Sequence, residues 1–263
     1  MITKDETITD LITKEAYCEE HNLNYEGIYL IHNDISILTS RCDLCEEEFN
    51  IERKKDEDQE IKLKNDENAL KLLNTFEKSN IPLRYREKDF DNYVCDNDEN
   101  KLNALKLIKS YYNEITNNKL KLGEALILCG KVGTGKTHLA CAIANDLIYK
   151  KIGTVFFATA YEIISIIRET YRKDSKKSTY EVMKELKEYD LLIIDEVGVQ
   201  RGTEDEQMLL FDIINSRYSY LKSIILISNL NITGIETFLG ERVIDRMKEN
   251  NGILINLNWN SYR

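Results

Sequence analysis

The chain has 263 residues, and its 36 Lys and Arg against 46 Asp and Glu give a formal net charge of −10. This excludes a protein that coats DNA by bulk positive charge, so any contact with nucleic acid requires a local basic patch. The chain is 42% hydrophobic, has no apolar run long enough to span a membrane and lacks the basic, then apolar start of a signal peptide, so we expect a globular cytoplasmic protein without membrane contact.

Four potential metal ligands stand in two closely spaced pairs near the N-terminus: Cys18 with His21, and Cys42 with Cys45. Short β-like runs, Ile28–Ile31 and Ile35–Leu38, lie between the pairs. Thiolates and an imidazole at this spacing are the ligands of a closed, tetrahedral, structural zinc site. We therefore expect zinc to let this segment fold with little hydrophobic core. The alternative is that these are four unrelated reduced side chains.

Residues 46–80 contain neither Gly nor Pro and are dense in charge. Their apolar residues are unevenly spaced, so the pattern predicts a largely exposed helix without heptad regularity. We interpret this stretch as a solvated connector between two folded parts, because runs of charge usually form solvated faces.

An alternating pattern follows Pro82. Residues 99–118 place apolar side chains at the three-to-four spacing of an amphipathic helix. Five short apolar runs are bounded by polar turns: Ala125–Cys129, Thr154–Ala158, Leu191–Ile194, Ile224–Ser228 and Ile253–Leu257. Such runs are typical of strands that are buried on both faces of a parallel sheet. The sequence therefore predicts an α/β domain.

The segment Gly130–Thr137 fits the phosphate-binding pattern G-x-x-x-x-G-K-[ST] and stands between an apolar run and a helix-like stretch. The glycines let backbone N–H groups surround phosphates, Lys136 would reach the β- and γ-phosphates, and Thr137 would offer its hydroxyl to Mg²⁺. The alternative is a simple glycine-rich turn. The expected ATP-binding residues are Gly130, Lys131, Val132, Gly133, Thr134, Gly135, Lys136, Thr137 and His138.

Polar side chains stand at the ends of two later apolar runs, those that begin at Leu191 and at Ile224. Asp195 and Glu196 end one run, and Ser228 and Asn229 end the other. A carboxylate at the carboxyl edge of a central strand can hold Mg²⁺, which we assign to Asp195. Glu196 would then act on the attacking water as general base. Taken alone, Ser228 and Asn229 would be interpreted as a turn.

Three phrases carry a resemblance to a known family: Asp190–Gln200, Leu239–Met247 and Asn258–Arg263. They look like parts of the AAA+ module of DnaC-type replicative helicase loaders. The resemblance covers about residues 80–263 and is shared more loosely with IstB-type transposition helper ATPases and DnaA initiators.

The resemblance implies a P-loop AAA+ domain with a five-stranded parallel sheet. It also implies catalytic roles for three polar residues, with Asn229 as sensor-1, Arg246 as an arginine finger offered to a neighbouring subunit, and Arg263 as sensor-2. A guanidinium supplied in trans would make hydrolysis depend on self-association through the AAA+ interface. From the residues alone, the favoured interpretation of Arg246 is a surface salt bridge with Asp245 or Glu241.

The stretch 159–190 is longer than a minimal connection and resembles the helical insertion with which loaders and initiators grip single-stranded DNA. Residues 168–177 contain five basic and two acidic side chains, a local charge of +3. Cations that follow the phosphate backbone, together with a ring that stacks on a base, suit sequence-tolerant binding. The alternative is a solvated loop. The expected DNA-binding residues are Arg168, Tyr171, Arg172, Lys173, Lys176 and Lys177.

These expectations combine into an ATP-dependent loader of a DnaB-type replicative helicase onto single-stranded DNA. We expect a zinc-binding domain at 1–45, a charged helical linker at 46–80 and an AAA+ ATPase domain at 81–263. The contact with the helicase is implied by the resemblance only. Two alternatives are an IstB-like transposition helper that acts on duplex DNA and an ATP-dependent scaffold with little turnover.

Overall fold

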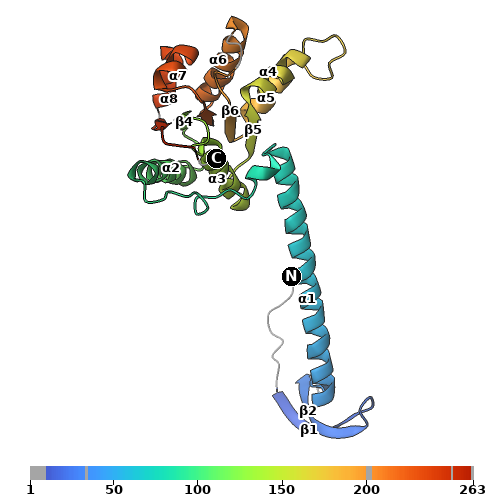
Figure 1. Ribbon diagram of the computed structural model, residues 1–263. Coiled ribbons are helices and arrows are strands. Elements are labelled where there is room, and N and C mark those ends of the chain that lie inside the picture. The colour runs from blue at the N-terminus through green and yellow to red at the C-terminus, as the bar shows by residue number, and fades with distance from the viewer. Residues whose placement is uncertain (1–9, 33–34, 200–202, 250, 262–263) are drawn as a thin grey trace. The chain divides into compact units, whose positions relative to one another are not determined.

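The computed structural model describes residues 10–32, 35–199, 203–249 and 251–261. The chain forms two compact units, Met1–Ala69 and Leu70–Arg263. The division lies inside one long helix, α1 (Asp43–Lys78), which is drawn in Figure 1. Our division at 45/46 and 80/81 stays a prediction.

The N-terminal unit holds an antiparallel sheet of β1 (Asp10–Cys18), β2 (Leu23–His32) and β3 (Ile35–Leu38), in that order. The two expected β-like runs are parts of β2 and β3, whereas β1 was missed. Among the described residues of this unit, only Ala16, Gly27 and Cys42 are buried. The unit therefore has very little hydrophobic core.

Helix α1 is exposed along most of its length, as its charge pattern predicted. Its charges pair at i,i+4 spacing, with 2.6 Å between Lys64 Nζ and Glu60 Oε1 and 3.6 Å between Arg53 Nε and Glu57 Oε1. Exposed pairs of this kind stabilise a helix by only about 0.2–0.5 kcal/mol each. Phe76, near the end of the helix, is buried in the C-terminal unit. No helix in the described part of the chain is long and apolar enough to cross a membrane.

The C-terminal unit is built on a five-stranded parallel sheet in the order β5-β6-β7-β4-β8. Its strands are β4 (Ala125–Gly130), β5 (Val155–Thr159), β6 (Leu191–Asp195), β7 (Ser223–Ile227) and β8 (Ile253–Leu257). Each of the five predicted runs therefore forms a strand, and the α/β class is confirmed.

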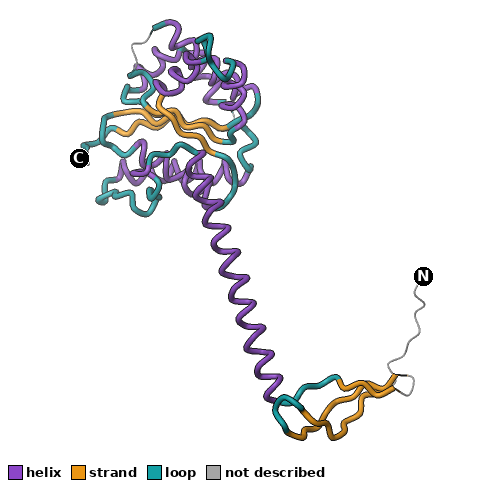
Figure 2. Tube along the Cα trace, turned by 90° about the vertical axis from the view of Figure 1, so that its right-hand side faces the viewer, coloured by secondary structure: helices purple, strands orange, loops and turns teal. Residues whose placement is uncertain are grey.

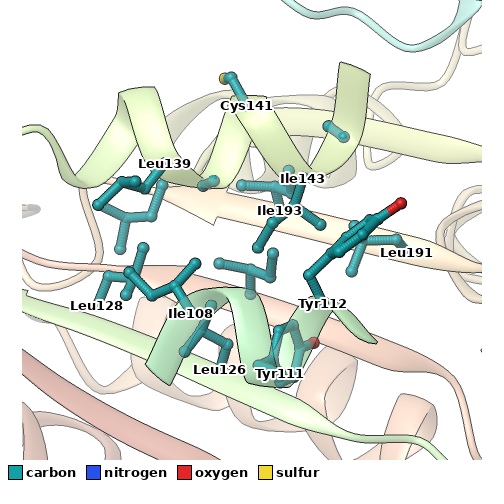
Figure 3. Packing of buried hydrophobic residues seen from close by; sticks show 14 of the residues in the cluster. Ile108, Tyr111, Tyr112, Leu126, Leu128, Leu139, Cys141, Ile143, Leu191 and Ile193 are labelled. Carbon is teal, nitrogen blue, oxygen red and sulfur yellow. The ribbon is translucent and has the colours of Figure 1, made fainter. Parts of the chain in front are cut away.

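Helices cover both faces of this sheet, as the tube view shows (Figure 2). They are η1 (Leu83–Tyr85), α2 (Glu99–Asn117), α3 (Lys136–Tyr149), α4 (Ala160–Glu169), α5 (Thr179–Glu188), α6 (Glu204–Ser219), α7 (Ile232–Leu239) and α8 (Glu241–Lys248). One core cluster contains α2, α3 and one face of the sheet, where Ile108 of α2 and Ile143 of α3 are fully buried. Figure 3 shows these side chains packed with Leu126 and Leu128 of β4. A second cluster fills the opposite face beneath α4 to α8.

The strand order decides where the polar residues meet. Strands β4, β6 and β7 are neighbours and run parallel, so their carboxyl ends share one edge of the sheet. In open parallel sheets, ligands bind outside the carboxyl ends of the strands. The glycine-rich loop and the two polar strand ends predicted from the sequence all lie at this edge.

Candidate functional site

The glycine-rich loop connects the end of β4 to the first turn of α3, as predicted. Gly133 and Gly135 have φ values of 78° and 91°, in the left-handed region that favours glycine. A Cβ on Gly135 would lie 2.5 Å from the Tyr93 ring. Gly135 caps α3 without any side chain, so the N–H groups of the first turn can bind an anion such as a phosphate.

Lys136, the first residue of α3, is 5% exposed. Its Nζ donates hydrogen bonds to the carbonyl oxygens of Gly130, at 2.8 Å, and Lys131, at 2.6 Å. Burial lowers the pKa of this ammonium group, and the negative charge of Asp195 opposes that shift. A phosphate would be a stronger acceptor than these neutral carbonyls, because its negative charge adds attraction between opposite charges to the hydrogen bond.

Thr137 and Asp195 meet across the carboxyl edge of the sheet. The Thr137 hydroxyl donates to Asp195 Oδ2 at 2.8 Å, and the Glu196 N–H donates to Asp195 Oδ1 at 2.7 Å. Burial raises the pKa of the Asp195 carboxyl, and the Thr137 hydrogen bond opposes that shift. Carboxylate and hydroxyl oxygens are hard ligands of the kind that Mg²⁺ prefers, so this pair fits a magnesium ion.

Glu196 and Asn229 are exposed and line the same cavity as Thr137 and Asp195. Glu196 has a φ of 59°, a conformation that costs a residue other than glycine about 1–3 kcal/mol. Ser228, which without the other motifs would be interpreted as a turn residue, is buried, and its hydroxyl donates to the Val197 carbonyl at 2.6 Å. This hydrogen bond ties the segment after β6 to the end of β7 and thereby helps to place Glu196 and Asn229.

The cavity at this edge has a volume of about 550 Å³. The sequence analysis missed one wall of it, which is formed by the segment before α2 and contains Arg84, Tyr85, Lys88, Asn92, Tyr93 and Val94. No periodic pattern of apolar residues in this segment indicates that it forms a wall of the cavity. Its position depends on α3, where Asn145 Nδ2 donates to the carbonyls of Tyr85 and Lys88, at 2.7 Å each.

His138, predicted to be part of the nucleotide site, also lines the cavity. Its Nε2 lies 2.9 Å from the Asp89 carbonyl oxygen, and its ring meets the Tyr93 ring edge to face. Burial lowers the pKa of this imidazole, and because a carbonyl oxygen can only accept, Nε2 is the donor to Asp89. His138 therefore connects α3 to the wall that the sequence analysis missed.

The predicted arginine finger, Arg246, is half-buried on α8 and does not line the cavity. Its guanidinium donates a hydrogen bond to Asn215 of α6 and lies 5.6 Å from the centre of the Tyr218 ring. Within the described residues it forms no ion pair, so the salt bridge with Asp245 or Glu241 is not present. Arg263, the predicted sensor-2 residue, lies outside the described residues.

The four predicted zinc ligands come together in the N-terminal unit, with all ligand atoms within 4.8 Å of one another. The His21 Nδ1 atom lies 3.6 Å from the sulfurs of Cys18 and Cys42 and 3.3 Å from that of Cys45. In a tetrahedral zinc site, ligand atoms lie about 3.5–3.8 Å apart. The four residues therefore fit this geometry.

Two further contacts support a metal at this position. His21 Nε2 lies 3.4 Å from Glu48 Oε1, and a carboxylate on the outer nitrogen commonly orients a metal-binding histidine. The Cys45 N–H, in the first turn of α1, donates at 3.4 Å to the sulfur of Cys42, the residue just before the helix. The sequence alone did not indicate the contact with Glu48.

The predicted DNA-binding residues stand on the end of α4 and on the loop to α5, which extends from the body of the C-terminal unit (Figure 1). Arg168 is paired with Asp205, at 2.8 Å, and with Glu206, at 3.3 Å, both on α6. Lys177 is paired with Glu185 at 2.7 Å. The structure thus directs these two cations toward carboxylates of the protein itself.

The remaining candidates are exposed. Tyr171 is 59% exposed, and Arg172 has a carboxylate of Asp174 at 4.0 Å. Lys173 and Lys176 form no ion pair within the described part of the chain. Tyr180, which the sequence analysis missed, is 76% exposed at the start of α5 and adds a second ring to this loop.

Comparison with known proteins gives a consistent family. Residues 66–263 match the family described as IstB-like ATP binding protein. The chain is 38% identical over 193 residues to the uncharacterized protein YdaV of Escherichia coli K12, covering 73% of each chain. It is 34% identical over 201 residues to the replicative helicase loader DnaC of the same strain, covering 76% of this chain and 79% of DnaC.

Two solved structures share the fold of the C-terminal unit. The crystal structure of the DnaC helicase loader aligns with a TM-score of 0.58 at 24% identity, over 66% of this chain and 99% of that one. The replication initiator DnaA bound to AMPPCP and single-stranded DNA aligns with a TM-score of 0.54 at 27% identity, over 69% of this chain and 52% of that one.

Proposed function

Because the chain belongs to the family of IstB-like ATP-binding proteins, we propose that it is a cytoplasmic ATPase that loads a replicative DNA helicase onto single-stranded DNA. The observation that carries the loader role is the 34% identity to DnaC over 79% of that protein's length. The nucleotide cavity supports an ATPase, because Lys136, Asp195 and Glu196, to which we assign roles in phosphoryl transfer, line it together.

ATP would bind with its phosphates in the loop Gly130–Thr137. There, Lys136 would exchange the loop carbonyls for the β- and γ-phosphates, which offer charged acceptors. The base would lie against the wall that contains Tyr85 and Tyr93, since this wall faces the same cavity. His138 would keep that wall in place through Asp89.

Thr137 and Asp195 would hold a magnesium ion, which when bound neutralises part of the phosphate charge. Glu196 stands one residue beyond Asp195, is exposed to the cavity and would accept a proton from the attacking water. Asn229 would help to orient that water from the end of β7.

The resemblance to loaders makes Arg246 the arginine that would act on the nucleotide of a neighbouring copy, and its place on α8, outside the lining of its own cavity, agrees with that role. Its hydrogen bond to Asn215 and the nearby Tyr218 ring would hold the guanidinium in place before assembly. Hydrolysis would then depend on self-association, with an arginine supplied in trans. A sensor-2 role for Arg263 also belongs to this proposal.

The N-terminal unit would contain one structural zinc ion, held by Cys18, His21, Cys42 and Cys45. With four protein ligands the site is closed, so the metal would stabilise the fold and would not act in catalysis. The resemblance to the loaders makes this unit, together with α1, the proposed contact with the helicase.

Single-stranded DNA would bind along the loop between α4 and α5. Exposed Lys173 and Lys176 would contact phosphates, with Arg172 beside them, and exposed Tyr171 would stack on a base. Arg168 and Lys177 would first have to leave their carboxylate partners.

The direct test of the partner is a pull-down with the replicative helicase of the organism that encodes the chain, with and without ATP. Capture of the helicase supports the loader, and no capture under either condition contradicts it. The family's description as IstB-like favours one other candidate, a transposition helper. Tighter binding to duplex than to single-stranded DNA would favour that function.

A further inference from the structure

One carbonyl of the glycine-rich loop accepts two buried hydrogen bonds from distant parts of the C-terminal unit. The backbone oxygen of Thr134 accepts from the Tyr93 hydroxyl at 3.0 Å and from the Trp259 indole Nε1 at 3.1 Å. Tyr93 and Trp259 are 6% and 8% exposed, and Thr134 is fully buried. Tyr93 lies outside the nucleotide-binding motif, and the resemblance to loaders, although one of its phrases contains Trp259, gave a role there only to Arg263.

The sheet brings the chain's last described residues beside the loop. Strand β8 pairs in parallel with β4, so that Gly130, where the loop begins, lies opposite Leu257, where β8 ends. The loop and the tail 258–261 therefore leave the sheet side by side. A Cβ on Gly133 would lie 2.1 Å from Ser261 Oγ, which shows that the tail packs directly on the loop.

The two hydrogen bonds fix the orientation of one peptide group. In a trans peptide, the carbonyl and the next N–H point in opposite directions, so a fixed Thr134 carbonyl also fixes the Gly135 N–H. That N–H belongs to the residue that caps α3 and lines the cavity. A preorganised donor stabilises a bound anion more than one that must first reorient.

We propose that Tyr93 and Trp259 are positioning residues of the nucleotide site, which hold the Thr134–Gly135 peptide ready for phosphate, and that Trp259 couples nucleotide binding to the tail 258–261. The proposal rests on ATP binding by the loop. It assigns the tail a role that does not depend on Arg263, because the contact is made by Trp259 and Ser261.

Tyr93→Phe and Trp259→Phe each remove one donor and keep an aromatic ring. Each should weaken ATP binding about 3- to 10-fold, the effect of one net hydrogen bond. The double variant should lose more than the product of the two single effects, because it leaves a buried carbonyl without either donor. Tyr111→Phe is the matched control, since Tyr111 is 1% exposed and donates to the Glu124 carbonyl away from the loop.

The measurement is the dissociation constant for Mg²⁺-ATP of the full chain by calorimetry, alongside the melting temperature of the nucleotide-free protein. All three single variants should have a lower melting temperature than the wild type, but only Tyr93→Phe and Trp259→Phe should bind ATP more weakly. Unchanged ATP affinity in both would overturn the positioning role.

A second readout needs no nucleotide. Amide hydrogen exchange over residues 131–137 should be faster in Tyr93→Phe and Trp259→Phe than in the wild type or in Tyr111→Phe. If wild-type protein binds no ATP, the proposed function fails, while this exchange experiment still decides whether the two side chains hold the loop. Unchanged exchange in both variants would reject the positioning role independently.

Coupling to the tail has its own signal, because Trp259 is the only tryptophan in the chain. Its fluorescence should change when Mg²⁺-ATP saturates the wild type, and change less in Tyr93→Phe once that variant is saturated. Constant emission at saturating ATP, with binding confirmed by calorimetry, would overturn the coupling.

Discussion

Replacing Cys42 with serine should unfold the N-terminal unit and leave the C-terminal unit intact. A unit of about 70 residues has a free energy of unfolding of about 3–10 kcal/mol at the usual stability per residue. A structural zinc site contributes about 10–16 kcal/mol in small domains. Because only three described residues of this unit are buried, hydrophobic packing cannot replace that contribution.

The assay combines elemental analysis with limited proteolysis of protein purified without chelators. The wild type should carry about one zinc per chain, and Cys42→Ser should lose it and be cleaved within residues 10–42. Cys95→Ser is the matched control, because Cys95 is a half-buried cysteine of the other unit and belongs to no metal cluster among the described residues. Zinc-free wild type that resists proteolysis would refute this reasoning, as would a protease-resistant Cys42→Ser variant.

Three further predictions concern the C-terminal unit. Lys136→Ala should abolish ATP hydrolysis and weaken ATP binding. Glu196→Gln should bind ATP normally but hydrolyse it about 10²- to 10⁴-fold more slowly than the wild type. If Glu196→Gln hydrolyses ATP as fast as the wild type, Glu196 is not the general base. Neutralising Lys173 should weaken single-strand binding and reduce its salt dependence, whereas Tyr171→Ala should weaken binding without changing the salt slope. A salt slope that falls as much in Tyr171→Ala as in the Lys173 variant would reject stacking by Tyr171. Arg246→Ala should keep its affinity for nucleotide, but its assembly-stimulated rate of ATP hydrolysis should fall about 10³- to 10⁵-fold, and mixing it with Lys136→Ala should partly restore that rate. If self-association, DNA and helicase all fail to stimulate hydrolysis by the wild type, Arg246 is not an arginine finger in trans.

The five strands and the nucleotide loop could be predicted from the sequence because their signals are local. A strand buried on both faces, such as the run Leu191–Ile194 of β6, must be continuously apolar, and the loop requires glycines at fixed positions. Their local patterns agree with the global fold, so short windows of sequence were sufficient.

Strand β1 and the cavity wall before α2 could not be predicted in this way. Strand β1 contains Lys14 and Glu15, and it is stabilised by nine residue pairs with β2 that no local pattern reveals. The cavity wall is held by tertiary hydrogen bonds from Asn145 and His138, which lie about 50 to 60 positions further along the chain.

The basic segment at residues 168–177 shows that a count of charges also cannot reveal tertiary contacts. Its excess of basic residues is local and was visible in the sequence. The partners of Arg168, however, are Asp205 and Glu206, on a helix 37 and 38 positions away. A count of charges could not separate the cations that pair within the protein from those that face solvent.

The most direct test of the central claim is helicase loading onto a closed circle of single-stranded DNA, which offers the helicase no free end. With ATP and the full chain, the cognate replicative helicase should become stably bound to the circle, and the Lys136→Ala variant should not support this. The account is contradicted if the helicase loads equally well without the chain. It is also contradicted if the chain leaves the helicase unloaded and binds duplex DNA more tightly than single-stranded DNA.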